Sequence, residues 1–141
     1  MMTAPISAQA RRSRIQKVAA VVALVFGLAT IASGASVLFG PEQARRAAGH
    51  VVLFVLWFNF LTGFLYVAAG IGLWRARLWG FWLSAGLALA LAVVFALFME
   101  RVATGGPFEM RTLYALAFRF TVWCLITIVA YRAILRRNAA A

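Results

Sequence analysis

An arginine in the middle of an apolar segment is the strongest chemical signal in this sequence. The segment lies between Arg111 and Arg132 and has the length that a helix needs to cross a bilayer. At 1.5 Å per residue, Arg119 lies only ~4 Å from the centre of that span. An arginine at such a depth costs about 2.5–3.5 kcal/mol on insertion scales. We therefore expect a partner, a water-filled cavity or an outward-leaning side chain to offset the cost.

Polar and aromatic residues of other segments fall at a similar depth. Asn59 lies ~4 Å from the centre of its own span, on the same side of the midplane as Arg119. Trp123 is four residues from Arg119, a spacing that permits a cation–π contact. Glu100, at the outer end of its helix, is the expected counter-ion. The predicted ligand site comprises Arg119, Asn59, Thr30, Thr62, Tyr66 and Trp123.

Two interpretations of this polar layer remain open. In the first, Arg119 and Asn59 bond to each other and lock two helices together, in an accessory or assembly subunit that forms a bundle with itself or with a partner. In the second, the alternative, Arg119, Asn59 and Thr30 hold a small anion or a lipid-like solute in a channel or carrier. Intramembrane charge favours a binding function by default, but a matched Arg–Asn pair is also a sufficient structural lock. We favour the accessory subunit.

Enzymatic chemistry has little support in the sequence. No pair of carboxylates lies within a span, no Ser/His/Asp set can be assembled, and the glycines follow no phosphate-loop pattern. His50 stands alone, without the cysteine, histidine or aspartate neighbours that a metal or haem site requires. We expect a protein without enzymatic activity, cofactor or metal.

The elements that position these residues are apolar helices. Hydrophobic residues make up 65% of the chain and charged residues only 12%, far below the soluble average of about 25%. The sequence predicts an all-α, polytopic membrane protein, a single transmembrane domain over residues 1–141 that forms a four-helix bundle. The expected helices cover about 18–39, 51–73, 78–99 and 112–135, with disorder expected at 1–10 and 138–141.

The first apolar segment has a second interpretation. It follows a basic stretch and contains small residues at 33–35, a pattern that is also typical of a cleavable signal. Because the apolar run continues past these residues to Phe39, we expect a retained first helix.

The distribution of lysine and arginine predicts the orientation. Nine lie on one side: four before the first span, two in the 74–77 turn and three on the C-terminal side, namely Arg132, Arg136 and Arg137. The other side carries four, together with all three glutamates of the chain. By the positive-inside rule, both termini are cytoplasmic. The net charge of +11 lies at the ends of apolar segments, so we expect anionic lipid at the cytoplasmic face and no nucleic acid.

Small residues recur on three of the spans. Because lipid and leucine are equally apolar, membrane helices associate through such residues, and one stripe is also suited to a second copy of the chain. The three stripes are Ala20, Ala23, Gly27, Thr30 and Gly34; Asn59, Thr62, Gly63, Tyr66 and Gly70; and Gly80, Ser84, Ala88, Ala92 and Ala96.

The connection between the second and third spans carries a resemblance. Residues 70–79 read Gly-Ile-Gly-Leu-Trp-Arg-Ala-Arg-Leu-Trp. They resemble the G-x-G-L-x-x-R-x-x-W hairpin of small, uncharacterised bacterial four-helix integral membrane proteins. At the position of the pattern's arginine this chain has Ala76, with Arg75 before it and Arg77 after it. The resemblance implies a four-helix architecture in a bacterial inner membrane. It implies no activity.

Overall fold

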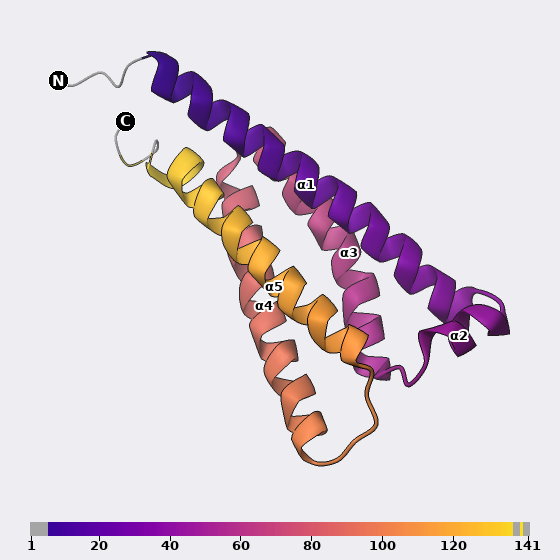
Figure 1. The fold of residues 1–141 in the computed structure, drawn as a ribbon. Helices are drawn as coiled ribbons and strands as arrows, with labels where there is room; N and C mark the ends of the chain where they lie inside the picture. Colours follow the sequence, from indigo (N-terminus) through magenta and orange to yellow (C-terminus); the bar gives the residue numbers. More distant parts are fainter. Residues whose placement is uncertain (1–5, 137–138, 140–141) are drawn as a thin grey trace.

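The structure is a computed structural model that describes residues 6–136 and residue 139, and all regular elements there are helical (Figure 1). Four helices are long and apolar enough to cross a membrane, which confirms the predicted all-α, multi-pass fold class. The elements are α1 (Ile6–Phe39), α2 (Glu42–Ala48), α3 (Leu53–Trp74), α4 (Leu78–Ala103), α5 (Met110–Ala130) and the π-helix η1 (Tyr131–Leu135).

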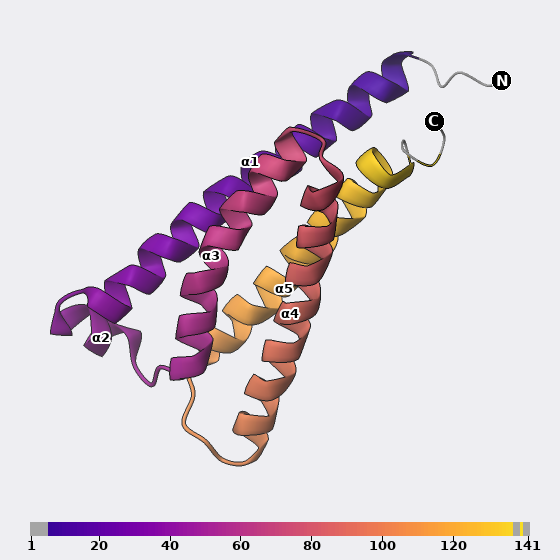
Figure 2. The same cartoon turned by 180° about the vertical axis from the view of Figure 1, so that it is seen from behind.

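The four long helices alternate in direction, so the start of α1 and the end of η1 lie at the same end of the bundle (Figures 1 and 2). We call this the terminal end; it also carries the 74–77 turn. The opposite end, with α2 and the 104–109 connection, is the loop end. Helix α1 packs along α3, and α4 packs against both α3 and α5.

Helix α1 is longer than the sequence predicted. It has 34 residues, about 51 Å at 1.5 Å per residue, against a hydrocarbon core of ~30 Å. Its polar first turns consist largely of Ala, Arg and Gln, which are good helix formers. Disorder was therefore the wrong expectation for residues 6–10. Residues 1–5, 138, 140 and 141 lie outside the described part, and residue 139 lies in a turn.

One polar side chain in this extension anchors α1 to α3. Gln16 is buried, and its Nε2 donates a hydrogen bond of 2.6 Å to the carbonyl oxygen of Leu73. The contact fixes α1 against the last turn of α3. It was missed because the sequence around Gln16 resembles an ordinary basic flank of a membrane span.

Helix α2 was not predicted, because its residues carry no apolar run. Good helix formers and an i,i+4 ion pair between Glu42 and Arg46, at 2.7 Å, favour it. Arg45 folds back, and its guanidinium donates to the carbonyl oxygens of Val37 and Leu38 at the end of α1. This basic cap satisfies two of the carbonyls that a helix C-terminus leaves unpaired.

Helices α1 and α3 meet through glycine, as the small-residue stripes predicted. A Cβ added at Gly27 would lie 2.8 Å from Val67 Cγ2 and 2.9 Å from the carbonyl oxygen of Gly63. A Cβ added at Gly63 would lie 2.7 Å from Ile31 Cγ1. A side chain at either glycine would therefore collide with the facing helix.

The predicted small-residue stripe on α4 does not stay on the buried face of the helix. Gly80 and Ser84 are buried, but Ala96 is exposed. The reason is geometric: each four-residue step advances 400° around an α-helix, so the stripe rotates 40° per step and reaches the opposite face. The buried face instead alternates steps of three and four residues along Gly80, Ser84, Leu87, Leu91, Val94 and Phe98.

Candidate functional site

Four buried side-chain atoms have no hydrogen-bond partner among the described residues. They are Asn59 Oδ1, Tyr66 Oη, Arg119 Nε and Trp123 Nε1. Buried polar groups are nearly always paired, so a cluster of four exceptions needs an explanation. All four belong to the six residues that the sequence singled out.

A cavity of about 230 Å³ brings three of the predicted residues together. Thr30 on α1, Asn59 on α3 and Arg119 on α5 are among its lining residues. Each helix presents one face, with lining positions spaced by three or four residues. The remaining lining residues are Ser33, Gly34, Val37, Ala48, Val51, Val52, Leu56, Arg111, Thr112 and Ala115.

The wall from α5 shows why Arg119 is accommodated. Thr112, Ala115 and Arg119 lie at i, i+3 and i+7, and side chains of a helix lean toward its N-terminus. Ala115, one turn before Arg119, has a small side chain and leaves room for the guanidinium. Arg111, two turns before, adds a second positive charge to the same wall.

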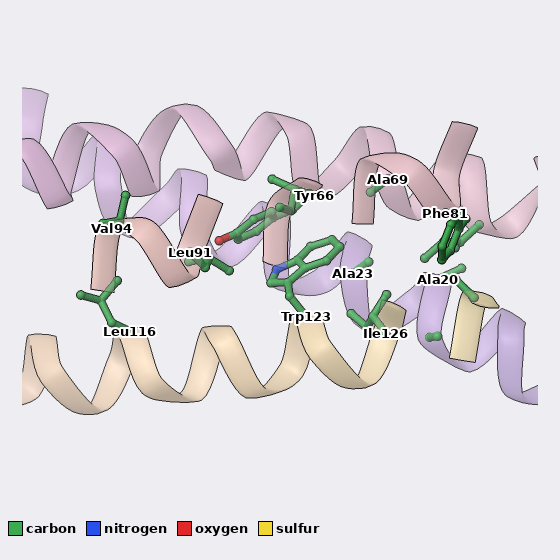
Figure 3. Packing of buried hydrophobic residues seen from close by; sticks show 14 of the residues in the cluster. Ala20, Ala23, Tyr66, Ala69, Phe81, Leu91, Val94, Leu116, Trp123 and Ile126 are labelled. Carbon is green, nitrogen blue, oxygen red and sulfur yellow. The ribbon is translucent and has the colours of Figure 1, made fainter. Parts of the chain in front are cut away.

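Below the cavity, the centre of the bundle is filled by two aromatic side chains. Tyr66 and Trp123 are fully buried, and their ring centroids lie 4.6 Å apart (Figure 3). The ring of Phe26 of α1 also stacks with Tyr66, with the centroids 6.1 Å apart. These two predicted residues do not line the cavity itself.

Three expected contacts of Arg119 are absent from the described part of the chain. No hydrogen bond joins Arg119 to Asn59, so the predicted lock does not form. The cation–π contact found among the described residues is that of Lys17 with Trp74, with Lys17 Nζ 5.6 Å from the ring centroid. The expected contact of Arg119 with Trp123 does not form, and the Trp123 ring packs on Tyr66. Glu100 was the wrong counter-ion, because it is exposed and lines a different hollow, beside Arg101 and Thr104.

Thr62 is the third predicted site residue that does not line the cavity. Its hydroxyl donates to the carbonyl oxygens of Phe58 and Asn59 in its own helix, at 2.8 and 3.2 Å. Back-bonding of this kind is common for threonine within helices and leaves no donor for a ligand.

The end of α2 and the residues that follow it border the cavity at the loop end. Arg111 donates to the carbonyl oxygen of Ala47 at 3.1 Å, and Glu109 accepts from the backbone N–H of His50 at 3.0 Å. Ala48, between these two attachments, contributes to the lining. No signal in the sequence indicates that Ala48 lines the cavity, because this depends on where the chain returns after α2.

The charge within the cavity is unbalanced. Two arginines line it, and no carboxylate does. The ion pair found among the described residues, Arg46 with Glu42, lies on the surface of α2. No group of three metal-ligating side chains occurs in that part of the chain. The cavity can therefore provide a ligand with hydrogen-bond donors and positive charge.

Comparisons of the chain with protein-family models, curated proteins and solved structures gave no match. The resemblance of residues 70–79 to a bacterial membrane hairpin therefore stays a prediction. The geometry of the cavity alone must support any assignment of function.

Proposed function

We propose that the protein is a non-enzymatic membrane protein that binds a small anion, or the phosphate of a lipid headgroup, in the cavity between α1, α3 and α5. The observation that carries the proposal is the half-buried Arg119, whose buried Nε has no partner in the described chain and which lines a cavity with Arg111 and without a carboxylate. The positive bias of the terminal end favours a cytoplasmic location for that end, in a bacterial inner membrane.

The size of the cavity restricts the ligand class. Sites for drug-sized molecules measure about 300–1,000 Å³, and this cavity of about 230 Å³ lies below that range. A single oxyanion with a few water molecules fits. The two arginines supply charge-assisted hydrogen bonds, while Thr30, Asn59 and Thr112 supply neutral ones.

The packed pair of Tyr66 and Trp123 favours a carrier over an open channel. Tyr66 and Trp123 fill the bundle directly beyond Arg119, and both are fully buried. An anion that reached Arg119 from the loop end would have to displace this pair to continue. Binding and release on one side, followed by a rearrangement, is the behaviour expected of a carrier.

Sulfate provides a direct test of the proposed binding. We expect sulfate to raise the melting temperature of the wild-type protein in nanodiscs of neutral lipid in a saturable way, at constant ionic strength against chloride. Arg119→Met should weaken this binding roughly 10- to 100-fold, since a charge-assisted hydrogen bond contributes about 1.5–3 kcal/mol. Ala115→Leu, which fills the cavity and keeps both charges, should abolish it.

Arg101→Met is the matched control, because Arg101 lies at the same end and lines a different hollow. Sulfate also stabilises proteins non-specifically, and that effect should survive in every variant. A saturable response that persists in Arg119→Met would contradict the proposal. So would a large loss of stability in Arg119→Met without sulfate, which is the behaviour of a structural lock.

A second candidate, the accessory or assembly subunit, is favoured by the stripe on α4. Its outer members, Ala92 and Ala96, rotate away from the helices of this chain, as a contact with a second copy or a partner requires. In a Cys124→Ser background, Ala96→Cys should then form intermolecular disulfides in native membranes. Leu97→Cys, one residue and 100° away, is the control, and equal crosslinking of both variants would count against an α4 interface.

A further inference from the structure

At the terminal end, a groove of about 640 Å³ lies between the first turns of α1 and the end of the chain's last helix. Four arginines line it: Arg11 and Arg12 from α1, and Arg132 and Arg136 from η1 and the residue after it. Segments more than a hundred positions apart in the sequence thus lie side by side at this end of the bundle (Figure 1). The groove is separate from the cavity that contains Arg119, which lies toward the loop end.

The four guanidinium groups form no ion pair with any described residue. The ion pair that the described residues do form, between Arg46 and Glu42, lies on α2. None of the three glutamates of the chain lies near them, because Glu42, Glu100 and Glu109 all belong to the loop end. The positive-inside rule and the dipole at a helix C-terminus each explain why single arginines occur at the cytoplasmic end of a membrane helix. Neither effect explains why four of them face one groove.

The lower wall of the groove is apolar. Ile15 of α1 and Ile128 of α5 line it on the side that faces the membrane interior. Charged side chains above apolar ones match the order of groups in a phospholipid, with its headgroup above its acyl chains. The volume also lies within the range of about 300–1,000 Å³ that is typical of ligand sites.

The backbone at this groove departs from the α-helix. Residues Tyr131–Leu135 form a π-helix, although no proline or glycine lies nearby to cause it. Single π-turns are rare and occur frequently at functional sites. Here the π-turn buries Ala133 and Ile134 in the core while Arg132 and Arg136 line the groove.

We propose that this groove is a specific site for the headgroup of a phospholipid that carries two phosphate groups. Arginine binds phosphate in a bidentate manner, and four guanidinium groups can engage two phosphates at once. Basic pockets between membrane helices are a recurrent form of site for multiply charged lipid headgroups. The proposal does not depend on the function of the Arg119 cavity.

The test uses the full chain in phosphatidylcholine nanodiscs with a small mole fraction of cardiolipin, and native mass spectrometry to count bound lipid. The wild-type protein should retain cardiolipin. Arg132→Gln/Arg136→Gln should weaken retention about 100-fold, as the loss of two charge-assisted contacts implies. Arg11→Gln/Arg12→Gln, on the other wall, should have a similar effect. All four arginines are exposed, so both variants should fold.

The matched control is Arg75→Gln/Arg77→Gln, which removes the same charge at the same end outside the groove. We expect it to retain cardiolipin nearly as well as the wild type. An equal loss in the control and in the groove variants would overturn the proposal in favour of diffuse attraction. Equal retention of phosphatidylglycerol at the same phosphate content would overturn the requirement for two phosphates. Displacement by soluble pyrophosphate at similar concentration would overturn the assignment to a lipid.

Discussion

Replacing Trp123 with alanine is expected to lower the free energy of unfolding by about 3 kcal/mol. Because lipid is as apolar as the bundle core, the transfer of an indole from lipid into the protein contributes little. The cost comes instead from the cavity left behind, about 24 cal/mol per Å³ over a void on the order of 100–150 Å³. Trp123 is fully buried and packs on Tyr66, so the surroundings have little room to collapse.

Denaturant titration in mixed micelles measures this effect, and two variants test its cause. Trp82→Ala removes the same side chain from a position that is 62% exposed, and it should change stability little. Trp123→Phe keeps a ring against Tyr66 and removes an N–H that has no partner in the described chain, so it should cost less than about 1.5 kcal/mol. A cost for Trp123→Phe as large as that for Trp123→Ala would show that the N–H, and not the packing, stabilises the bundle.

The fold class could be predicted because apolar runs of bilayer length are a property of composition. The lengths of α1 and α2 could not, because their added residues, such as Gln16, are polar and carry no apolar run. The α4 stripe failed for a different reason. Spacing by four suggests a face, but only alternation of three and four keeps residues on one side of a long helix.

The candidate site could be predicted in part: the depth of its residues along the helices follows from the sequence, but the direction in which each side chain points does not. Counting 1.5 Å per residue placed Asn59 and Arg119 at one depth, and the structure brings both to one cavity. Depth says nothing about rotation around the helix axis. For that reason Thr62, at a suitable depth, bonds to its own helix, and the partner of Trp123 is Tyr66 rather than Arg119.

The arginine groove was missed because lysines and arginines were counted by side of the membrane. Such a count includes both Arg11 and Arg132 but contains no information on whether the two residues lie close together. Only the packing of the first helix against the last brings them to one groove. Contacts between distant parts of a sequence leave no signal in a single chain.

Replacing Gly80 with alanine is expected to lower the free energy of unfolding by about 3 kcal/mol, at the upper end of the range for overpacking. A Cβ there would lie 2.6 Å from the carbonyl carbon of Gly72 and 2.8 Å from the backbone nitrogen of Leu73. Both are backbone atoms, which cannot rotate away as a side chain can. Helices α3 and α4 must therefore separate at their turn, which also strains the bond from Gln16 to the carbonyl oxygen of Leu73.

Gly86→Ala is the control within the same helix. Nothing lies within 4 Å of a Cβ added at Gly86, so alanine there should stabilise the helix by up to about 1 kcal/mol through its higher helix propensity. The two substitutions make the same chemical change and differ only in their neighbours. Opposite signs of the two effects, measured by the same titration, would establish the close approach of α3 and α4 at Gly72. If Gly80→Ala were neutral or stabilising, the two backbones could not lie as close as the structure has them.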